Sequence, residues 1–214
     1  MDLVTITNPR SPLSEAFRTL RTNLSFYSLE SPLRSLVVTS PVMGEGKSST
    51  VANLAVTMAQ SGRKTVLVDC DLRRPSLHTL FDRQAEPGFT DAILHNDEPA
   101  LQETAVNNLW LLAAGTKPPN PADILGTPQV DQLIARLQEK ADIILFDAPP
   151  VNAVTDAAVL GAKVDGVLLV LSAGKTRREH AERAKEILEK ARVKIIGATL
   201  TNGPKDSSME AYYG

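Results

Sequence analysis

The chain of 214 residues has little cysteine, few aromatic residues and no long apolar run. Its one cysteine, Cys70, excludes a disulfide within the chain and suits a reducing compartment. No apolar stretch approaches the roughly 20 residues that cross a bilayer, and residues 1–5 lack the layout of a signal peptide. The formal net charge of −2 gives no support for a nucleic-acid-binding surface. We therefore expect a cytoplasmic domain that binds no nucleic acid and reaches a membrane only through a partner.

Apolar runs and amphipathic segments alternate along the chain. Runs rich in Val, Ile and Leu predict strands at residues 35–40, 65–69, 109–113, 142–146, 165–171 and 194–200. Helical patterns occur at residues 47–61, 128–140, 155–163 and 176–192, and an amphipathic helix precedes the first strand. This alternation predicts an α/β fold with a mostly parallel sheet and helices on both faces. We divide the chain into a helical extension at 1–30, a nucleotide-binding domain at 31–203 and a short flexible tail at 204–214.

The segment after the first expected strand has the composition of a phosphate-binding loop, or P-loop. Gly44 and Gly46 let the backbone curl close to phosphates, and Lys47 and Ser48 open the following helix, where free backbone N–H groups meet an anion. We expect Lys47 to reach the β- and γ-phosphates and Ser48 to offer its hydroxyl to Mg²⁺. Pro41 stands where the simplest such motif has glycine. The alternative is a glycine-rich turn between a strand and a helix, with a solvent-exposed lysine.

Acidic residues end two other apolar runs. Asp69 and Asp71 stand one residue apart at the end of one run, and Asp147 ends another. Because parallel strands end at the same edge of a sheet, we expect these carboxylates beside the phosphate loop. We predict Asp69 and Asp147, with Ser48, around the metal, and Lys47 and the three aspartates as the catalytic residues. Asp69 or Asp71 would accept a proton from an incoming hydroxyl, and the spacing does not distinguish them; the alternative for each acid is a structural role at a strand end.

Three motifs give the chain a resemblance to the bacterial tyrosine kinases of capsule and exopolysaccharide synthesis, which have a P-loop NTPase fold. They match residues 37–48, 66–73 and 143–149, with Met43 where the family usually has proline. The resemblance implies a protein-tyrosine kinase that depends on ATP and Mg²⁺. It implies a nucleotide site made of Gly44, Glu45, Gly46, Lys47, Ser48, Ser49, Arg73 and Asn202.

Two of these nucleotide-site residues have plainer alternatives. Asn202 resembles the base-contacting asparagine of the family, but an asparagine before Gly203 also suits a turn. Arg73 would neutralise phosphate charge, or would pair with nearby acids.

A further match concerns self-assembly. Glu15, Arg18 and Arg21 have the spacing of a family motif implicated in ring-shaped oligomers. On a helical wheel they lie away from an apolar stripe, so we expect them to face solvent while the stripe packs inward. The alternative is an ordinary solvated face with a weak Glu15–Arg18 pair. The stripe comprises Leu13, Phe17, Leu20 and Leu24.

The last residues include two adjacent tyrosines, Tyr212 and Tyr213, of the three in the chain. Family members are autophosphorylated between neighbouring subunits on a C-terminal tyrosine cluster, so both are candidate acceptors. A disordered end or a docked aromatic pair are the alternatives.

The resemblance also implies partners. It implies a separate transmembrane polysaccharide co-polymerase that activates the kinase, other copies of the chain in a ring, and protein substrates with tyrosines. A positioning or partition ATPase of the same fold is the main alternative, although Val42 stands where those proteins have a lysine that reaches across a dimer. A nucleotide-binding scaffold without transfer activity is the other.

Overall fold

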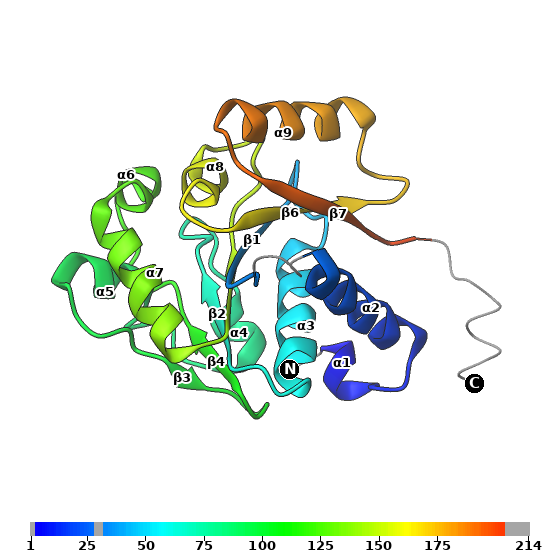
Figure 1. Ribbon diagram of the computed structural model, residues 1–214. Helices are drawn as coiled ribbons and strands as arrows, with labels where there is room; N and C mark the ends of the chain where they lie inside the picture. Colours follow the sequence, from blue (N-terminus) through cyan, green and yellow to red (C-terminus); the bar gives the residue numbers. More distant parts are fainter. Residues whose placement is uncertain (1–2, 28–31, 204–214) are drawn as a thin grey trace.

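The computed structural model describes residues 3–27 and 32–203, which form a seven-stranded sheet with helices on both faces (Figure 1). The strands lie in the order β3-β4-β2-β5-β1-β6-β7, and only β3 is antiparallel to its neighbour. The predicted α/β fold and mostly parallel sheet are thereby confirmed. The strands are β1 (Ser35–Thr39), β2 (Thr65–Asp69), β3 (Gln102–Glu103), β4 (Leu109–Leu112), β5 (Ile143–Asp147), β6 (Gly166–Ser172) and β7 (Ile195–Thr201).

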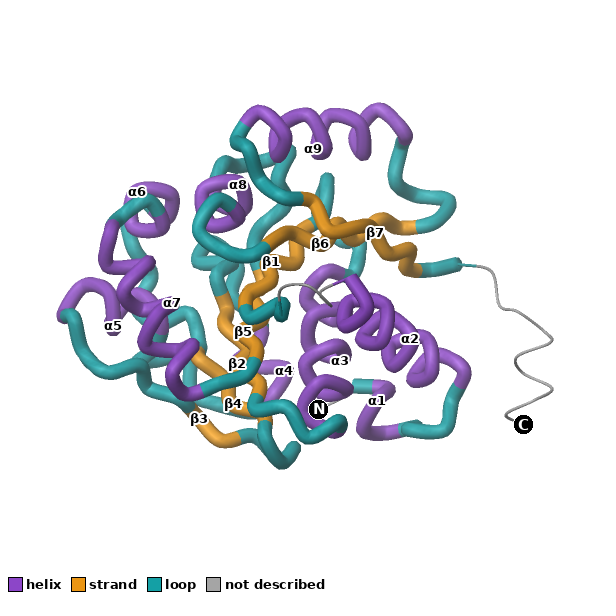
Figure 2. The backbone as a smooth tube through the Cα atoms, viewed as in Figure 1, coloured by secondary structure: helices purple, strands orange, loops and turns teal. Residues whose placement is uncertain are grey.

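Two helical layers cover the sheet. One layer contains α1 (Val4–Thr7), α2 (Pro12–Tyr27), α3 (Lys47–Gln60) and α4 (Leu77–Phe81). The other contains α5 (Phe89–His95), α6 (Pro121–Leu125), α7 (Pro128–Lys140), α8 (Asp156–Gly161) and α9 (Arg178–Lys190). Figure 2 shows the strands running between these layers.

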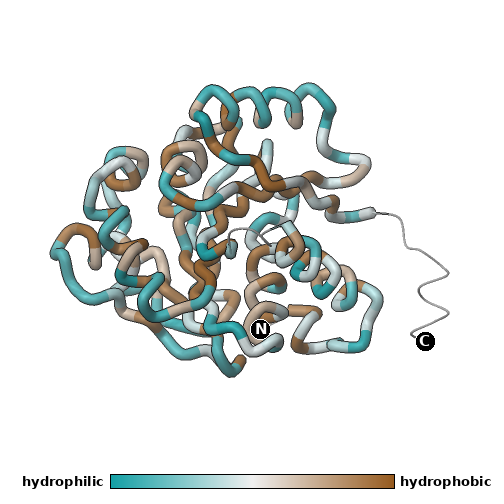
Figure 3. Tube along the Cα trace, viewed as in Figure 1, coloured by the Kyte–Doolittle hydropathy of each residue, from teal (hydrophilic) through white to brown (hydrophobic). Residues whose placement is uncertain are grey.

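The sheet separates two apolar clusters because successive side chains of a strand point to opposite faces. In β1, Val38 packs with the α3 layer, while Val37 packs with the layer that contains α7. In β5, Leu145 and Phe146 divide in the same way. Apolar residues are therefore continuous along these central strands, where the tube in Figure 3 is brown.

The elements that the sequence did not predict are short. They are α1, α4, α5, α6 and β3, of seven residues or fewer, and such lengths hold too few residues for a periodic pattern to emerge. Among them, α6 begins at Pro121, with Asn120 as its N-cap. Proline suits the first helical position because the N–H it lacks would have no partner there.

The expected orientation of α2 is wrong in part. Leu13 is 56% exposed, whereas Ser14 and Leu24 are buried. Arg21 lies on the packed side of the helix, where its Nη1 donates to the carbonyl of Thr57 at 3.2 Å. Leu24 and Leu20 pack on the core cluster, so the apolar stripe faces inward there and is exposed at Leu13.

None of the helices in the described ranges is both long and apolar enough to span a bilayer. Tyr212 and Tyr213 lie outside the described residues, as does the rest of the tail.

Candidate functional site

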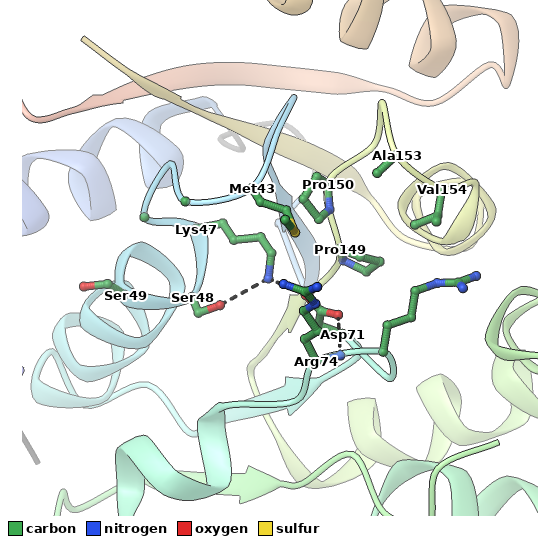
Figure 4. A pocket seen from close by; sticks show the side chains of 13 residues that line it. Met43, Lys47, Ser48, Ser49, Asp71, Arg74, Pro149, Pro150, Ala153 and Val154 are labelled. Carbon is green, nitrogen blue, oxygen red and sulfur yellow. Dashed lines mark hydrogen bonds and ion pairs between the residues drawn. The ribbon is translucent and has the colours of Figure 1, made fainter. Parts of the chain in front are cut away.

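A cavity of about 390 Å³ opens beside the carboxyl ends of the central strands. In Figure 4 its side chains come from the loop after β1, the start of α3, and the segments that follow β2 and β5. This is the edge at which parallel α/β sheets bind ligands. The lining residues are Met43, Gly44, Gly46, Lys47, Ser48, Ser49, Asp71, Arg73, Arg74, Pro149, Pro150, Ala153 and Val154.

The phosphate loop has the backbone that its glycines predict. Gly44 and Gly46 have φ angles of 75° and 86°, a left-handed region that strains other residues. The loop ends at Gly46, and α3 begins at Lys47, so the first N–H groups of a 14-residue helix face the cavity edge. Ser48 and Ser49 line the cavity from the first turn of this helix.

Lys47 lies between two of the predicted acids. Its Nζ is 2.9 Å from Asp71 Oδ2 and 3.1 Å from Asp147 Oδ1, and it donates to Ser48 Oγ at 3.2 Å. Burial alone would lower the pKa of Lys47, but the two carboxylates outweigh burial and raise it. The lysine therefore carries its charge into the cavity, where phosphate oxygens would replace or join its carboxylate partners.

Asp147, the last residue of β5, contacts Lys47 but does not line the cavity. The residue is fully buried, and its Oδ2 has no hydrogen-bond partner within the described residues. Burial raises the pKa of Asp147, and the nearby Lys47 opposes this rise without cancelling it. An orphaned buried carboxylate oxygen beside Ser48 suits a hard cation such as Mg²⁺.

The carboxylates do not form a complete metal cage by themselves. Among the described residues, no three His, Cys, Asp or Glu side chains gather closely enough to hold a metal ion. Mg²⁺ commonly binds through one or two protein ligands together with substrate phosphates and water. Ser48 and Asp147 fit that smaller contribution.

Asp69 lies deeper than the cavity wall. Its register partner on β5 is Asp147, and its side chain is fully buried. Oδ2 accepts hydrogen bonds at 2.9 Å from the backbone N–H groups of Ser76 and Leu77, and Oδ1 accepts one from Asp71 at 3.2 Å. Burial, followed by repulsion from Asp147, raises the pKa of Asp69 to about 7. Asp69 thus holds the start of α4. A proton on Asp69 would relieve its repulsion from Asp147.

Asp71 lies just after β2, so it reaches the cavity by a turn and not by strand alternation. Its Oδ1 accepts the backbone N–H of Arg74 at 3.1 Å, while Oδ2 contacts Lys47. Asp71 is on the cavity wall, whereas Asp69 and Asp147 are not, and of these two Asp147 contacts Lys47. The structure therefore brings Lys47, Asp71 and Asp147 into direct contact and places Asp69 behind them.

Glu45 points away from the cavity. This buried carboxylate accepts the backbone N–H of Val42 at 3.0 Å and a short hydrogen bond from Thr176 Oγ1. The hydroxyl of Thr201 donates to the Glu45 carbonyl at 2.7 Å. The Glu45 side chain thus fastens the loop to the segment after β6, and its carbonyl fastens the loop to the last residue of β7. Its predicted role in nucleotide binding stays a prediction.

Arg73 follows the plainer of its two alternatives. Its Nε and Nη2 donate to the two oxygens of the buried Asp156 at 2.9 and 3.1 Å. This bidentate pair further raises the pKa of Arg73. Arg73 still lines the cavity, but its guanidinium is already occupied.

Asn202 lies beyond the end of β7. Its Nδ2 donates to Ser172 Oγ at 3.0 Å, and it adopts a left-handed φ of 54°, which asparagine tolerates. It is absent from the cavity wall described above. Its predicted contact with a base therefore stays a prediction.

Two charged residues of the site escaped the sequence reasoning. Arg74 lines the cavity next to Arg73, and Asp156 anchors Arg73 from the start of α8. The doubled arginine after the Asp69–Asp71 pair was a visible signal. Asp156 gave no such signal, because an acidic residue in the first turn of a helix is usually explained by its interaction with the helix dipole.

Glu15 and Arg18 form an ion pair of 2.8 Å on α2, and both side chains are about one-third exposed, at 34% and 31%. Arg18 also donates to the Pro9 carbonyl at 2.5 Å. The two residues are available to a neighbouring molecule only in part, and Arg21 less so because of its contact with α3.

Comparisons with known proteins found a matching family model, similar chains and similar solved structures. A family model described as "ParA: NUBPL iron-transfer P-loop NTPase" matches residues 33–202. The chain is 42% identical to the tyrosine-protein kinase YwqD of Bacillus subtilis (strain 168), over 100% of this chain and 91% of that protein. It is similar to the solved kinase domain of the Escherichia coli tyrosine kinase ETK, with a TM-score of 0.91 and 32% identity over 97% of this chain and 82% of that one. The chimerical protein CapA2B2 is similar too, with a TM-score of 0.90 and 33% identity over 95% of this chain and 90% of that one.

Proposed function

We propose that this chain, which belongs to the ParA-type P-loop NTPases and within them to the bacterial tyrosine kinases, transfers the γ-phosphoryl group of ATP to tyrosines. The acceptors include Tyr212 and Tyr213 of its own tail. The observation that carries this proposal is the meeting of Lys47, Asp71 and Asp147 beside a glycine loop and a helix N-terminus. Lys47 supplies a cation for the phosphates, Asp71 a proton acceptor, and Asp147 a free carboxylate oxygen for Mg²⁺. Phosphoryl transfer depends on positioning groups of these kinds.

The residues of the chain divide this work. The backbone N–H groups after Gly44 and the Nζ of Lys47 bind the triphosphate and oppose the negative charge that develops during transfer. Asp71, on the cavity wall, is the better placed of the two candidate bases to take the phenol proton. Asp69 holds the segment that carries Asp71 by accepting its backbone N–H. Because the pKa of Asp69 is raised to about 7, its protonated form reduces the negative charge near Asp147.

Ser48 and Asp147 are the groups that would hold Mg²⁺, since one has a hydroxyl at the cavity and the other a free buried oxygen. The ion, when bound, supplies positive charge that neutralises phosphate oxygens.

Regulation of the enzyme follows from transfer between copies. Glu15, Arg18 and Arg21 on α2 would contribute to a ring in which the tail of one subunit enters the site of the next. Phosphorylation would add about two negative charges to each tail tyrosine, which would loosen its docking. The ring would thus open as phosphorylation proceeds.

A transmembrane activator would recruit the chain to the inner face of the cell membrane and link it to capsule or exopolysaccharide synthesis. This part of the proposal is supported by the family resemblance and by the similarity to the chimerical protein CapA2B2. We expect the isolated chain to have low activity that rises when the cytoplasmic peptide of such an activator is added.

Mixing two chains tests transfer between subunits. Lys47→Met with an intact tail is the acceptor, and a chain with Tyr212→Phe and Tyr213→Phe is the donor. Incubation with labelled ATP and Mg²⁺, followed by mass spectrometry, is expected to show phosphotyrosine on the Lys47→Met chain, with at least about a hundredfold less when it is incubated alone.

The same measurement separates the alternatives. Release of phosphate without any phosphotyrosine would indicate an ATPase of the positioning type, and neither product would indicate a scaffold. Phosphotyrosine confined to an active chain with its own tail would contradict transfer between subunits.

A further inference from the structure

Arg74 is the cation of the cavity wall whose guanidinium has no partner among the described residues. Lys47 is held by Asp71, and Arg73 is held by Asp156. The hydrogen bonds of Arg74 come from its backbone N–H, which donates to the carbonyl and the carboxylate of Asp71 at 3.0 and 3.1 Å. Its side chain is exposed, so a full positive charge lies at the edge of the site.

The surroundings of this charge suit a tyrosine-containing peptide. Met43, Pro150 and Val154 line the cavity with apolar groups, and Met43 is 57% exposed. Figure 4 shows these side chains, Asp71 and Arg74 around one hollow. A phenol ring could rest against the apolar groups with its hydroxyl toward Asp71, which would leave the peptide backbone at the mouth beside Arg74.

We propose that Arg74 is a specificity residue that binds a carboxylate two residues before the acceptor tyrosine. This inference rests on the proposed kinase function and identifies its substrate class as an acidic tyrosine peptide. A guanidinium binds a carboxylate through paired N–H donors, a geometry that a neutral amide matches poorly. The occupant to which we commit is the tail of a second copy of this chain, in which Glu210 precedes Tyr212 by two residues.

The spacing selects between the two tail tyrosines. Side chains alternate along an extended peptide, so Glu210 and Tyr212 face the same side, and Tyr213 faces the other. A tail bound through Glu210 and Arg74 presents Tyr212 to Asp71. Tyr212 is therefore the first acceptor.

A contact between Arg74 and the triphosphate is the competing role for the same charge. The loop N–H groups and Lys47 already face the phosphate side of the cavity, whereas Arg74 is carried by the turn after β2 and is exposed. Its exposure leaves Arg74 accessible to a peptide, and Figure 4 draws its side chain close to Lys47, so the nucleotide role is the outcome to be excluded. The two roles give different results in the following experiment.

Peptide binding tests the proposal without requiring transfer. The probe is a fluorescent peptide of residues 205–214 with Tyr213→Phe, made with Glu210 or with Glu210→Gln, and binding to the full chain in the presence of ADP is followed by anisotropy. We expect the wild type to bind the glutamate peptide about fivefold more tightly, as one partly exposed ion pair provides. Arg74→Ala should bind both peptides equally, and the exposed Arg183→Ala on α9 should retain the fivefold preference.

A charge exchange and a time course complete the test. Arg74→Glu is expected to prefer a peptide with Glu210→Arg, and mass spectrometry of wild-type chains with ATP should show Tyr212 phosphorylated about fivefold faster than Tyr213.

Equal binding of both peptides by the wild type, or an unchanged preference in Arg74→Ala, would overturn the proposal. An equal loss for both peptides, with a raised KM for ATP, would assign Arg74 to the nucleotide instead. Absence of phosphotyrosine would count against the kinase function, while the binding result would still be read.

Discussion

The buried carboxylates of this site have a cost that is visible in their proton affinity. Burial raises the pKa of Asp69 to about 7 and also raises that of Asp147, although an isolated aspartate titrates near 4. Lys47 offsets only part of this effect, since it is shared between Asp147 and Asp71. A bound cation would favour the ionised carboxylates. Mg²⁺ would therefore offset the free-energy cost of burying their negative charge.

The raised pKa of Asp69 gives a pH dependence of defined sign. The folded protein holds a proton on Asp69 between about pH 4 and 7, where the unfolded chain has released it. The free energy of unfolding should therefore fall as pH rises through this window, by about 1 kcal/mol or more from this group. Asp69→Asn is expected to flatten that fall, which urea unfolding at a series of pH values would measure.

The control for this pH series is Glu139→Gln, an exposed acid on α7, which should keep the wild-type slope. The slope is the quantity to compare, because asparagine also changes the hydrogen bonds to Ser76 and Leu77 and thereby shifts stability at every pH. A slope in Asp69→Asn equal to that of the wild type would contradict the prediction.

The phosphate loop depends on elements distant in sequence. Lys175 donates to the Gly44 carbonyl at 2.9 Å, and Thr176 and Thr201 bind the side chain and the carbonyl of Glu45. The loop after β1 is thus held by residues that follow β6 and by the last residue of β7. A loop with two left-handed glycines has many unfolded conformations to lose, so these contacts prepare it for the nucleotide.

Loss of this clamp should affect nucleotide binding more than chemistry. Glu45→Ala is expected to raise the KM for ATP about tenfold and to change kcat less than about threefold, because its carboxylate does not face the cavity. Glu45→Gln should keep the KM within about threefold, since an amide can still accept from Val42 and reach Thr176. Phosphotyrosine formation against ATP concentration, with direct nucleotide titration, would measure both; an unchanged KM in Glu45→Ala would show that the clamp is dispensable.

The complete subunit presents α2 as a candidate contact surface. This helix packs on α3 through Leu24 and Arg21, and the ion pair of Glu15 with Arg18 remains partly exposed. Exposed apolar residues, Leu13 at 56% and Phe26 at 65%, lie toward its two ends. Of the two arginines, Arg21 is bound to α3, and Arg18 stays in the partly exposed ion pair.

Substitutions on α2 should separate assembly from stability. Arg18→Glu is expected to shift the chain from ring to monomer while the free energy of unfolding changes by less than about 0.5 kcal/mol. Arg21→Ala should lower it by about 1 kcal/mol, because the Thr57 carbonyl loses a charged donor. Sedimentation velocity and urea unfolding would measure the two effects, with Arg183→Glu as control. A ring that persists in Arg18→Glu, or a monomeric wild type, would contradict the role of this surface.

Local patterns were sufficient for every strand of the sheet except β3, for the P-loop and for the choice of the acids. The apolar run of β2, the glycines around Glu45 and the acids at 69, 71 and 147 are readable because each depends on neighbours in sequence. The expectation that the acids meet beside Lys47 also followed, since parallel strands end at one edge. The contacts of Lys47 with Asp71 and Asp147 are in accord with it.

Other features depended on packing between distant segments. The partner of Arg73 is 83 residues away at Asp156, and the buried side chain of Glu45 meets Thr176 across 131 residues. The contact of Arg21 on α2 with the Thr57 carbonyl of α3 is likewise not visible in the pattern of α2 itself. One-dimensional patterns report which side chains avoid water, but ion pairs and hydrogen bonds are chosen among all the groups that folding brings within about 3 Å, and only the folded chain specifies that set.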